Sequence, residues 1–170
     1  GEGGLDILRA SYGMDSWDLR SHGSRVRAAY LIVAVLQPLC THTGTPCKHM
    51  SILGKGDIDA LRLEQKLVKF AIAVMKYQNA QGLLASNENP STSALHKRPE
   101  WVSEFGRPNK PEGPWRYVRS DGCQLGMRWP SVKDPDAPMQ KAQDWVANYD
   151  LSLMGLRCRR ACAVSCCTHH

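Results

Sequence analysis

Two residues, Cys40 and Glu88, have types and positions suited to chemistry on a substrate. Cys40 lies in Gln37-Pro-Leu-Cys40-Thr-His-Thr43, directly after the longest apolar run. A thiol there becomes a nucleophile when main-chain N–H groups or a cation lower its pKa from about 8.5. Glu88, in Asn87-Glu88-Asn-Pro90, can donate a proton or bind the amidine edge of a base. Alone, each residue is as well explained as a bystander thiol or a loop carboxylate, so the pair is more informative.

Three elements are expected to position this pair. Ala28–Leu36 is an unbroken apolar run, typical of a central parallel strand buried on both faces. Asp57 is a suitable N-cap for an amphipathic helix that ends at Ala80, and Leu83–Ser86 is a short apolar strand. Strand, helix and strand in this order predict a right-handed crossover unit. Because parallel strands end at one edge of the sheet, Cys40 and Glu88 are expected to converge.

The rest of the chain extends this architecture. Trp115–Ser120 and Lys141–Asn148 are two more candidate strands. The Pro-rich stretch from Asn87 to Pro114 is expected to be a long surface loop, of the kind that often carries function. The fold class predicted is α/β, with a Rossmann-like, mostly parallel sheet and crossover helices. We expect one domain over residues 1–150 and a Cys/His-rich C-terminal segment over residues 151–170. The five tryptophans are interpreted mainly as core or interface anchors.

The order strand, Pro-x-Cys-Thr, helix, strand, Glu-Asn-Pro resembles that of cytosine-C5 DNA methyltransferases, in which a Pro-Cys nucleophile at a strand end precedes a Glu-Asn pair. The chain is more similar still to divergent methyltransferase-like domains of retroelement-type polyproteins. These domains share the Pro-x-Cys-Thr and Glu-Asn-Pro motifs, an Asp-Gly-Cys-x-x-Gly stretch and a trailing Cys/His segment. The resemblance extends from Gly13 to Cys162.

The resemblance implies a mechanism with S-adenosylmethionine as cofactor and nucleic acid as substrate. Cys40 would add to C6 of a cytosine, and Glu88 would contact N3 and the amino group of that base. The base would be flipped out of the duplex to reach the thiol. Asp15 and Asp18 lie where the family keeps an acid near the cofactor ribose.

Other features depart from the family. No Gly-rich cofactor loop precedes this region, so we expect the Rossmann-like sheet to be incomplete at its N-terminus. Thr41-His42-Thr43 replaces the family's Gln-x-Phe-Ser, and no basic Gln-x-Arg-x-Arg segment follows. These departures favour a catalytically inactive or truncated descendant over a working enzyme. The alternative is a non-catalytic structural or interaction subunit that docks on a larger assembly.

Cysteine and histidine residues suggest zinc. The C-terminal segment offers Cys158, Cys162 and Cys166, and Cys123 is expected to reach them as a fourth ligand. A helical stripe of cysteines packed in the core explains the same spacing. A second candidate set comprises two Cys-x-His pairs, Cys40, His42, Cys47 and His49. A zinc-stabilised nucleic-acid binder is therefore a third functional class.

Composition limits the remaining alternatives. Twenty-two Lys and Arg against sixteen Asp and Glu give a net charge of +6, which favours polyanionic partners such as nucleic acid. No apolar stretch approaches the roughly 20 residues that span a bilayer, which predicts a soluble chain. Seven cysteines, four of them in the last thirteen residues, do not resemble a secreted disulfide framework. We therefore expect an intracellular, reducing compartment.

Overall fold

The computed structural model describes residues 19–45, 58–125 and 142–157. In this part the chain is a mixed α/β structure with one four-stranded sheet and a small two-stranded sheet. Several predicted site residues lie outside the described residues, namely Asp15, Asp18, Cys47, His49, Cys158, Cys162 and Cys166.

The apolar run Ala28–Leu36 is not a strand, so that prediction is wrong. Helix α2 (His22–Tyr30) continues into the π-helical turn η1 (Leu31–Leu36). The Ser21 hydroxyl caps α2 by accepting a hydrogen bond from the Ser24 N–H at 3.1 Å. Most of η1 is exposed, so no neighbouring strands bury it on two faces. A short, unbroken apolar run has no periodicity that distinguishes a helix from a strand. Here the Ser21 N-cap is the local signal that favours a helix.

The crossover unit from the first sheet strand to the second is present. Strand β1 (Cys40–Gly44), helix α3 (Ile58–Ala80) and strand β2 (Leu84–Pro90) follow one another, and β1 pairs with β2 in parallel. The predicted helix over Asp57–Ala80 and the strand from Leu83 are confirmed to within a few residues. Gly82, with φ +69°, provides the left-handed turn between α3 and β2.

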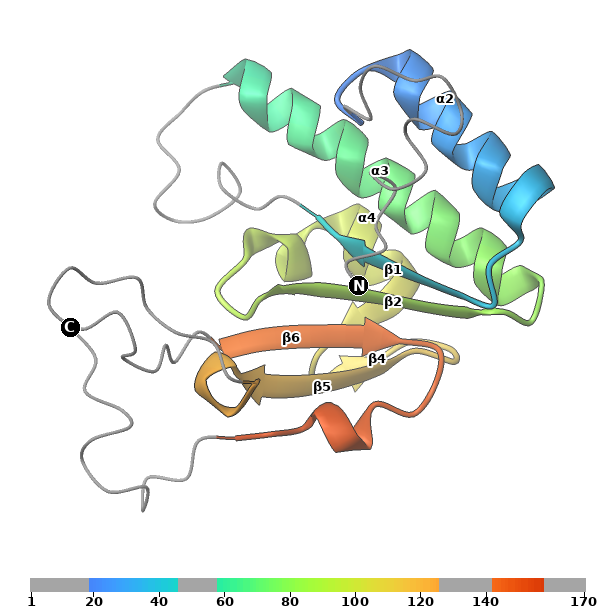
Figure 1. Cartoon of the computed structure of the whole chain (residues 1–170). Coiled ribbons are helices and arrows are strands. Elements are labelled where there is room, and N and C mark those ends of the chain that lie inside the picture. The colour runs from blue at the N-terminus through green and yellow to red at the C-terminus, as the bar shows by residue number, and fades with distance from the viewer. Residues whose placement is uncertain (1–18, 46–57, 126–141, 158–170) are drawn as a thin grey trace, which may run out of the picture.

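The larger sheet has the strand order β1-β2-β6-β5. Strands β5 (Arg116–Asp121) and β6 (Ala142–Ala147) confirm the two later candidate strands. Of the three neighbouring pairs, β1–β2 is parallel, while β2–β6 and β6–β5 are antiparallel. A mostly parallel, Rossmann-like sheet is therefore not confirmed. Since β6 alone is reversed, β1, β2 and β5 run in one direction and their carboxyl ends share an edge (Figure 1).

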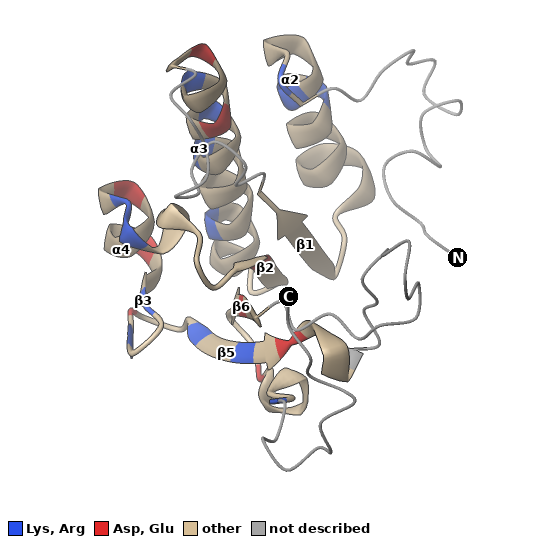
Figure 2. Ribbon diagram, turned by 90° about the vertical axis from the view of Figure 1, so that its left-hand side faces the viewer, with Lys and Arg blue, Asp and Glu red and all other residues tan. Residues whose placement is uncertain are grey.

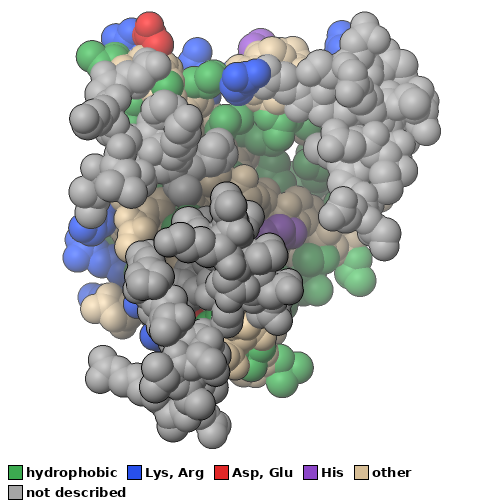
Figure 3. Space-filling view, turned by 60° about the vertical axis from the view of Figure 1, so that its left-hand side comes forward, with side chains coloured by type: hydrophobic (Ala, Val, Ile, Leu, Met, Phe, Trp, Pro, Cys, Tyr) green, Lys and Arg blue, Asp and Glu red, His purple; other side chains and the backbone are tan. Residues whose placement is uncertain are grey.

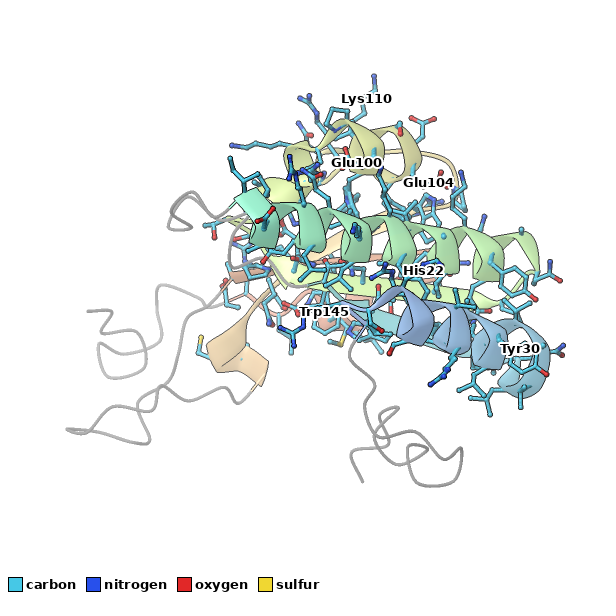
Figure 4. All side chains as sticks on the ribbon, turned by 90° about the horizontal axis from the view of Figure 1, so that it is seen from above. His22, Tyr30, Glu100, Glu104, Lys110 and Trp145 are labelled. Carbon is cyan, nitrogen blue, oxygen red and sulfur yellow. The ribbon has the colours of Figure 1, made fainter. Side chains whose placement is uncertain are left out.

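The main core lies between the sheet and helices α3 and α4 (Pro99–Phe105). Val68 and Met75 of α3 pack in it with Trp101, Phe105 and Trp115. The tryptophan interpretation is confirmed for Trp101 and Trp115, which are 0% and 2% exposed. Helices α2 and α4 lie on either side of α3, with Tyr30 at one end of the molecule and Glu100 and Glu104 on the α4 side (Figure 4).

The segment from β2 to β5 is more structured than a loop. It contains the 3-10 turn η2 (Ala94–Lys97), helix α4, and the short hairpin of β3 (Gly106–Arg107) and β4 (Lys110–Pro111). The 3-10 turns η3 (Gly122–Leu125) and η4 (Ser152–Met154) follow β5 and β6. Among the described residues, no helix has the length and apolar character needed to cross a membrane.

Candidate anion-binding pocket

A cavity of about 570 Å³ opens where β2 and β5 end and β6 begins. Such a volume is typical of small-ligand pockets. It also lies at the carboxyl ends of like-directed strands, where open α/β sheets commonly bind ligands. Its lining comes from the turn after β2, from η2, from the β3–β4 hairpin and from β5 and β6: Ser91, Thr92, Ser93, His96, Lys97, Arg107, Pro108, Asn109, Arg119 and Asp144.

Three cationic side chains line this pocket, each from a different element. Lys97 ends η2, Arg107 belongs to β3 and Arg119 lies on β5. Figure 2 shows basic residues on the same side of the molecule beside α4, on β3 and along β5. In Figure 3 Lys and Arg side chains gather along one edge of the face shown. Asp144 is the single carboxylate among the described residues of the lining, so this part of the pocket favours anions.

Asp144 fixes the orientation of Arg119. These residues are register partners on β5 and β6, and Arg119 donates from Nε and Nη2 to the two carboxylate oxygens at 2.5 and 2.8 Å. This bidentate hydrogen bond raises the pKa of Arg119 further above its ordinary value. The Asp144 side chain is 3% exposed, whereas that of Arg119 is 41% exposed. Arg119 therefore keeps donor groups for an anion while its guanidinium plane is held in place.

His96 is buried in the pocket wall. The ring is 7% exposed, and both ring nitrogens are shielded from solvent by the surrounding protein. Its polar neighbours are the Pro90 carbonyl and Asp144, whose Oδ2 lies 3.8 Å from Nε2, and Trp101 and Tyr117 meet the ring edge-on. Burial lowers the pKa of His96, against the opposing effects of Asp144 and Pro90, and favours the neutral ring.

The turn after β2 supplies neutral hydroxyl groups beside the cations. The Ser91 N–H bonds to the Ala142 carbonyl at 2.9 Å, which ties this turn to the start of β6. The Ser93 hydroxyl accepts a hydrogen bond from the Leu95 N–H and caps η2. The same hydrogen bonds hold His96 and Lys97 at the pocket, so the site is built on regular elements and a fixed turn.

The sequence prediction placed Cys40 beyond the end of a strand, but Cys40 begins β1. In the β1–β2 register Cys40 pairs with Leu84, and Glu88 pairs with Gly44. Four residues of strand therefore separate the two positions, about 13 Å at 3.3 Å per residue. Both residues lie on the same face of the sheet. The prediction that they converge is wrong, because β1 begins at Cys40, where the predicted strand had already ended.

Cys40 instead lies in a polar cluster on the sheet face opposite α3. The Thr43 hydroxyl contacts Met75 of α3, so strand alternation turns Cys40 and His42 to the other face. There His42 Nδ1 lies 3.0 Å from the Ser86 hydroxyl, and burial lowers the pKa of His42. Burial raises the pKa of Tyr149, whose phenol lies beside Ser86 and Cys40. Asp144, which lines the pocket, lies on the α3 side of the sheet. The pocket and the Cys40 cluster are thus on opposite faces of the sheet.

The predicted zinc ligands are only partly within the described chain. Cys123, in η3, is a partly buried free thiol, and Cys40 is an exposed one. Among the described residues no three or more His, Cys, Asp or Glu side chains are grouped to hold a metal ion. The proposed partners of Cys123 lie outside the described residues, so the zinc hypothesis stays a prediction.

The residues that line the pocket were not predicted as site residues from the sequence. His96, Lys97 and Arg107 lie in the long loop predicted to be functional, which was the one available signal. Arg119 and Asp144 are 25 residues apart, and their pairing depends on the β5–β6 register. No sequence motif marks that register.

Comparison with known proteins gives no relative: no protein-family model, no curated protein and no solved structure matches the chain. The resemblance to cytosine-C5 DNA methyltransferases therefore stays a prediction from short motifs.

Proposed function

We propose that this chain is a nucleic-acid-binding α/β domain whose pocket takes up a phosphate group of the ligand. The observation that carries the proposal is the convergence of Lys97, Arg107 and Arg119 on one cavity, whose described lining contains one carboxylate. Nucleic acids combine a repeated phosphate anion with the polar groups that such a cavity can accept.

Pre-organisation of Arg119 supports phosphate recognition in particular. A guanidinium already oriented by Asp144 loses little conformational freedom when an anion binds. The exposed side chains of Lys97 and Arg107 can approach the remaining phosphate oxygens from the opposite wall. The net charge of +6 adds a long-range attraction that does not depend on sequence.

The experiment compares Arg107→Ala with Arg62→Ala in titrations of fluorescent single-stranded and duplex oligonucleotides. Arg62 is the matched control because its side chain is 71% exposed on α3, away from the pocket lining. We expect Arg107→Ala to weaken binding about tenfold, as the loss of one charge-assisted hydrogen bond predicts, and Arg62→Ala to leave it nearly unchanged. Equal losses in the two variants would show that binding is diffuse and does not use the pocket.

A methyltransferase-like activity of nucleic-acid-modifying ancestry is the second candidate. Its support is the common direction of β1, β2 and β5, together with a pocket directly after Asn89-Pro90 at the end of β2. In this proposal Cys40 would be the nucleophile and Glu88 the base-binding acid, with S-adenosylmethionine as cofactor. Their separation in the β1–β2 register weighs against joint action on one base.

Calorimetric titration with S-adenosylmethionine, with metal analysis of the same sample, tests the second candidate. Saturable micromolar binding would justify assays of DNA methylation with Cys40→Ser and Glu88→Gln. If methylation is observed and survives both changes, the two assignments are wrong. Absence of binding leaves the phosphate proposal intact, since no step of that proposal uses the cofactor.

A non-catalytic subunit of a larger assembly is supported by one surface feature. Val26, Tyr30 and Leu39 expose 53%, 63% and 72% of their surface along α2 and the segment that leads to β1. Exposed apolar side chains in one region are typical of interaction surfaces. The free thiols of Cys40 and Cys123 fit the proposal of a reducing, intracellular location.

A further inference from the structure

We propose that the pocket recognises a phosphomonoester, the terminal phosphate of a nucleic-acid strand or of a free nucleotide, in preference to an internal phosphodiester. This inference rests on the proposed function, because it names which phosphate of the ligand the pocket takes. Two observations carry it: the charge of the described lining and the number of donor groups on its cations.

The charge of the lining matches a dianion. Among the described residues of the lining, Lys97, Arg107 and Arg119 against Asp144 leave two unit positive charges, and burial favours the neutral form of His96. An internal phosphodiester carries one negative charge, whereas a phosphomonoester carries about 1.5 to 2 at pH 7. Charge complementarity therefore favours the terminal group.

The number of donors also suits a terminal phosphate. A phosphomonoester presents three terminal oxygen atoms, and a phosphodiester presents two. Arg119 is held by Asp144 with donor groups to spare. Arg107 and Lys97 add donors from β3 and η2. The three cationic side chains can therefore each donate to a different terminal oxygen of a phosphomonoester.

The test compares two oligonucleotides of one sequence, labelled at the 3′ end and carrying either a 5′-phosphate or a 5′-hydroxyl. By fluorescence anisotropy we expect the 5′-phosphate form to bind at least about tenfold more tightly. Arg107→Ala should remove most of this difference, and Arg62→Ala should retain it. Thermal unfolding of each variant establishes that it is folded before binding is compared.

The outcomes separate this inference from the function on which it rests. Equal affinity of the wild-type chain for the two oligonucleotides overturns the inference but leaves nucleic-acid binding in place. Failure to bind either form overturns the proposed function as well. Competition by a nucleoside 5′-monophosphate at concentrations near those of the strand assigns the site to free nucleotides, whereas weak competition assigns it to strand ends; both results support phosphomonoester recognition.

Discussion

His96 is a polar residue in a buried and largely aromatic setting. It lies among Trp101, Tyr117 and Asp144, near the Pro90 carbonyl, and both of its ring nitrogens are shielded from solvent. Stability would be served equally by an apolar ring of the same size.

We therefore expect His96→Phe to preserve or raise the free energy of unfolding at pH 7, by up to about 1 kcal/mol. The reason is that the substitution removes two buried polar atoms and keeps the ring contacts. Urea denaturation measures this effect. A destabilisation of more than about 2 kcal/mol would assign His96 a structural role instead.

Tyr117 predicts a loss of stability at alkaline pH. Burial raises its pKa to about 12, while its hydroxyl accepts a hydrogen bond from Trp101 Nε1 at 2.8 Å. Because the folded chain favours the neutral phenol, its contribution is complete below pH 10 and is lost as the pH rises towards 12. We expect the wild-type chain to lose about 2 kcal/mol more than Tyr117→Phe over this range. Equal pH dependence of the two proteins in urea denaturation would contradict the shift.

At the scale of elements, the β3–β4 hairpin determines where Arg107 lies. Gly106, with φ +72°, begins β3, and a Cβ at this position would lie 2.4 Å from the Lys110 carbonyl oxygen. Backbone atoms form the obstacle, so no side-chain movement relieves it. The hairpin thus depends on a glycine next to a pocket residue.

Gly106→Ala should therefore cost more stability than Gly113→Ala. Both glycines have positive φ, but a Cβ at Gly113 would have no heavy atom within 4 Å. We expect a loss of about 1 kcal/mol for Gly113→Ala from backbone strain alone and at least 2 kcal/mol for Gly106→Ala. Denaturant titrations of the two variants give the comparison. Gly106→Ala should also weaken phosphate binding, and equal stability losses would show that the hairpin shifts to accept the Cβ.

Sequence patterns were informative about elements with strong periodicity. Helix α3 has one buried stripe, with Val68 and Met75 fully enclosed, and it begins and ends near the predicted residues. The strands β2, β5 and β6 follow the predicted segments as well. The run Ala28–Leu36 failed because its apolar residues are contiguous, and contiguous residues fit a helix and a buried strand equally.

At the scale of the whole molecule, the sheet separates two groups of polar residues. The pocket belongs to the face covered by α3 and α4, and the Cys40, His42 and Ser86 cluster belongs to the other face. A ligand held in the pocket is therefore remote from the Cys40 thiol. Phosphate binding and any chemistry at Cys40 can be tested independently.

The salt dependence of binding should report the number of phosphate contacts made by the whole surface. For a basic chain with a three-cation pocket, the logarithm of the affinity falls linearly with the logarithm of salt concentration. We expect Arg107→Ala to make this slope shallower by about one unit and Arg62→Ala to leave it unchanged. Titrations from roughly 50 to 200 mM salt measure the slopes. Parallel wild-type and Arg107→Ala slopes would remove Arg107 from the phosphate contacts.

The sequence by itself determined the mixed α/β class, helix α3 and the strands that follow it, because periodicity and capping are local properties of the chain. Only the tertiary structure decided strand order, register and the reversal of β6. These depend on pairing between distant segments, and they bring Arg119 to Asp144, place Asp144 beside His96 and hold Cys40 apart from Glu88. A one-residue change of register would turn each strand side chain to the opposite face of the sheet. The pocket therefore depends on strand pairing, which the residue types alone do not specify.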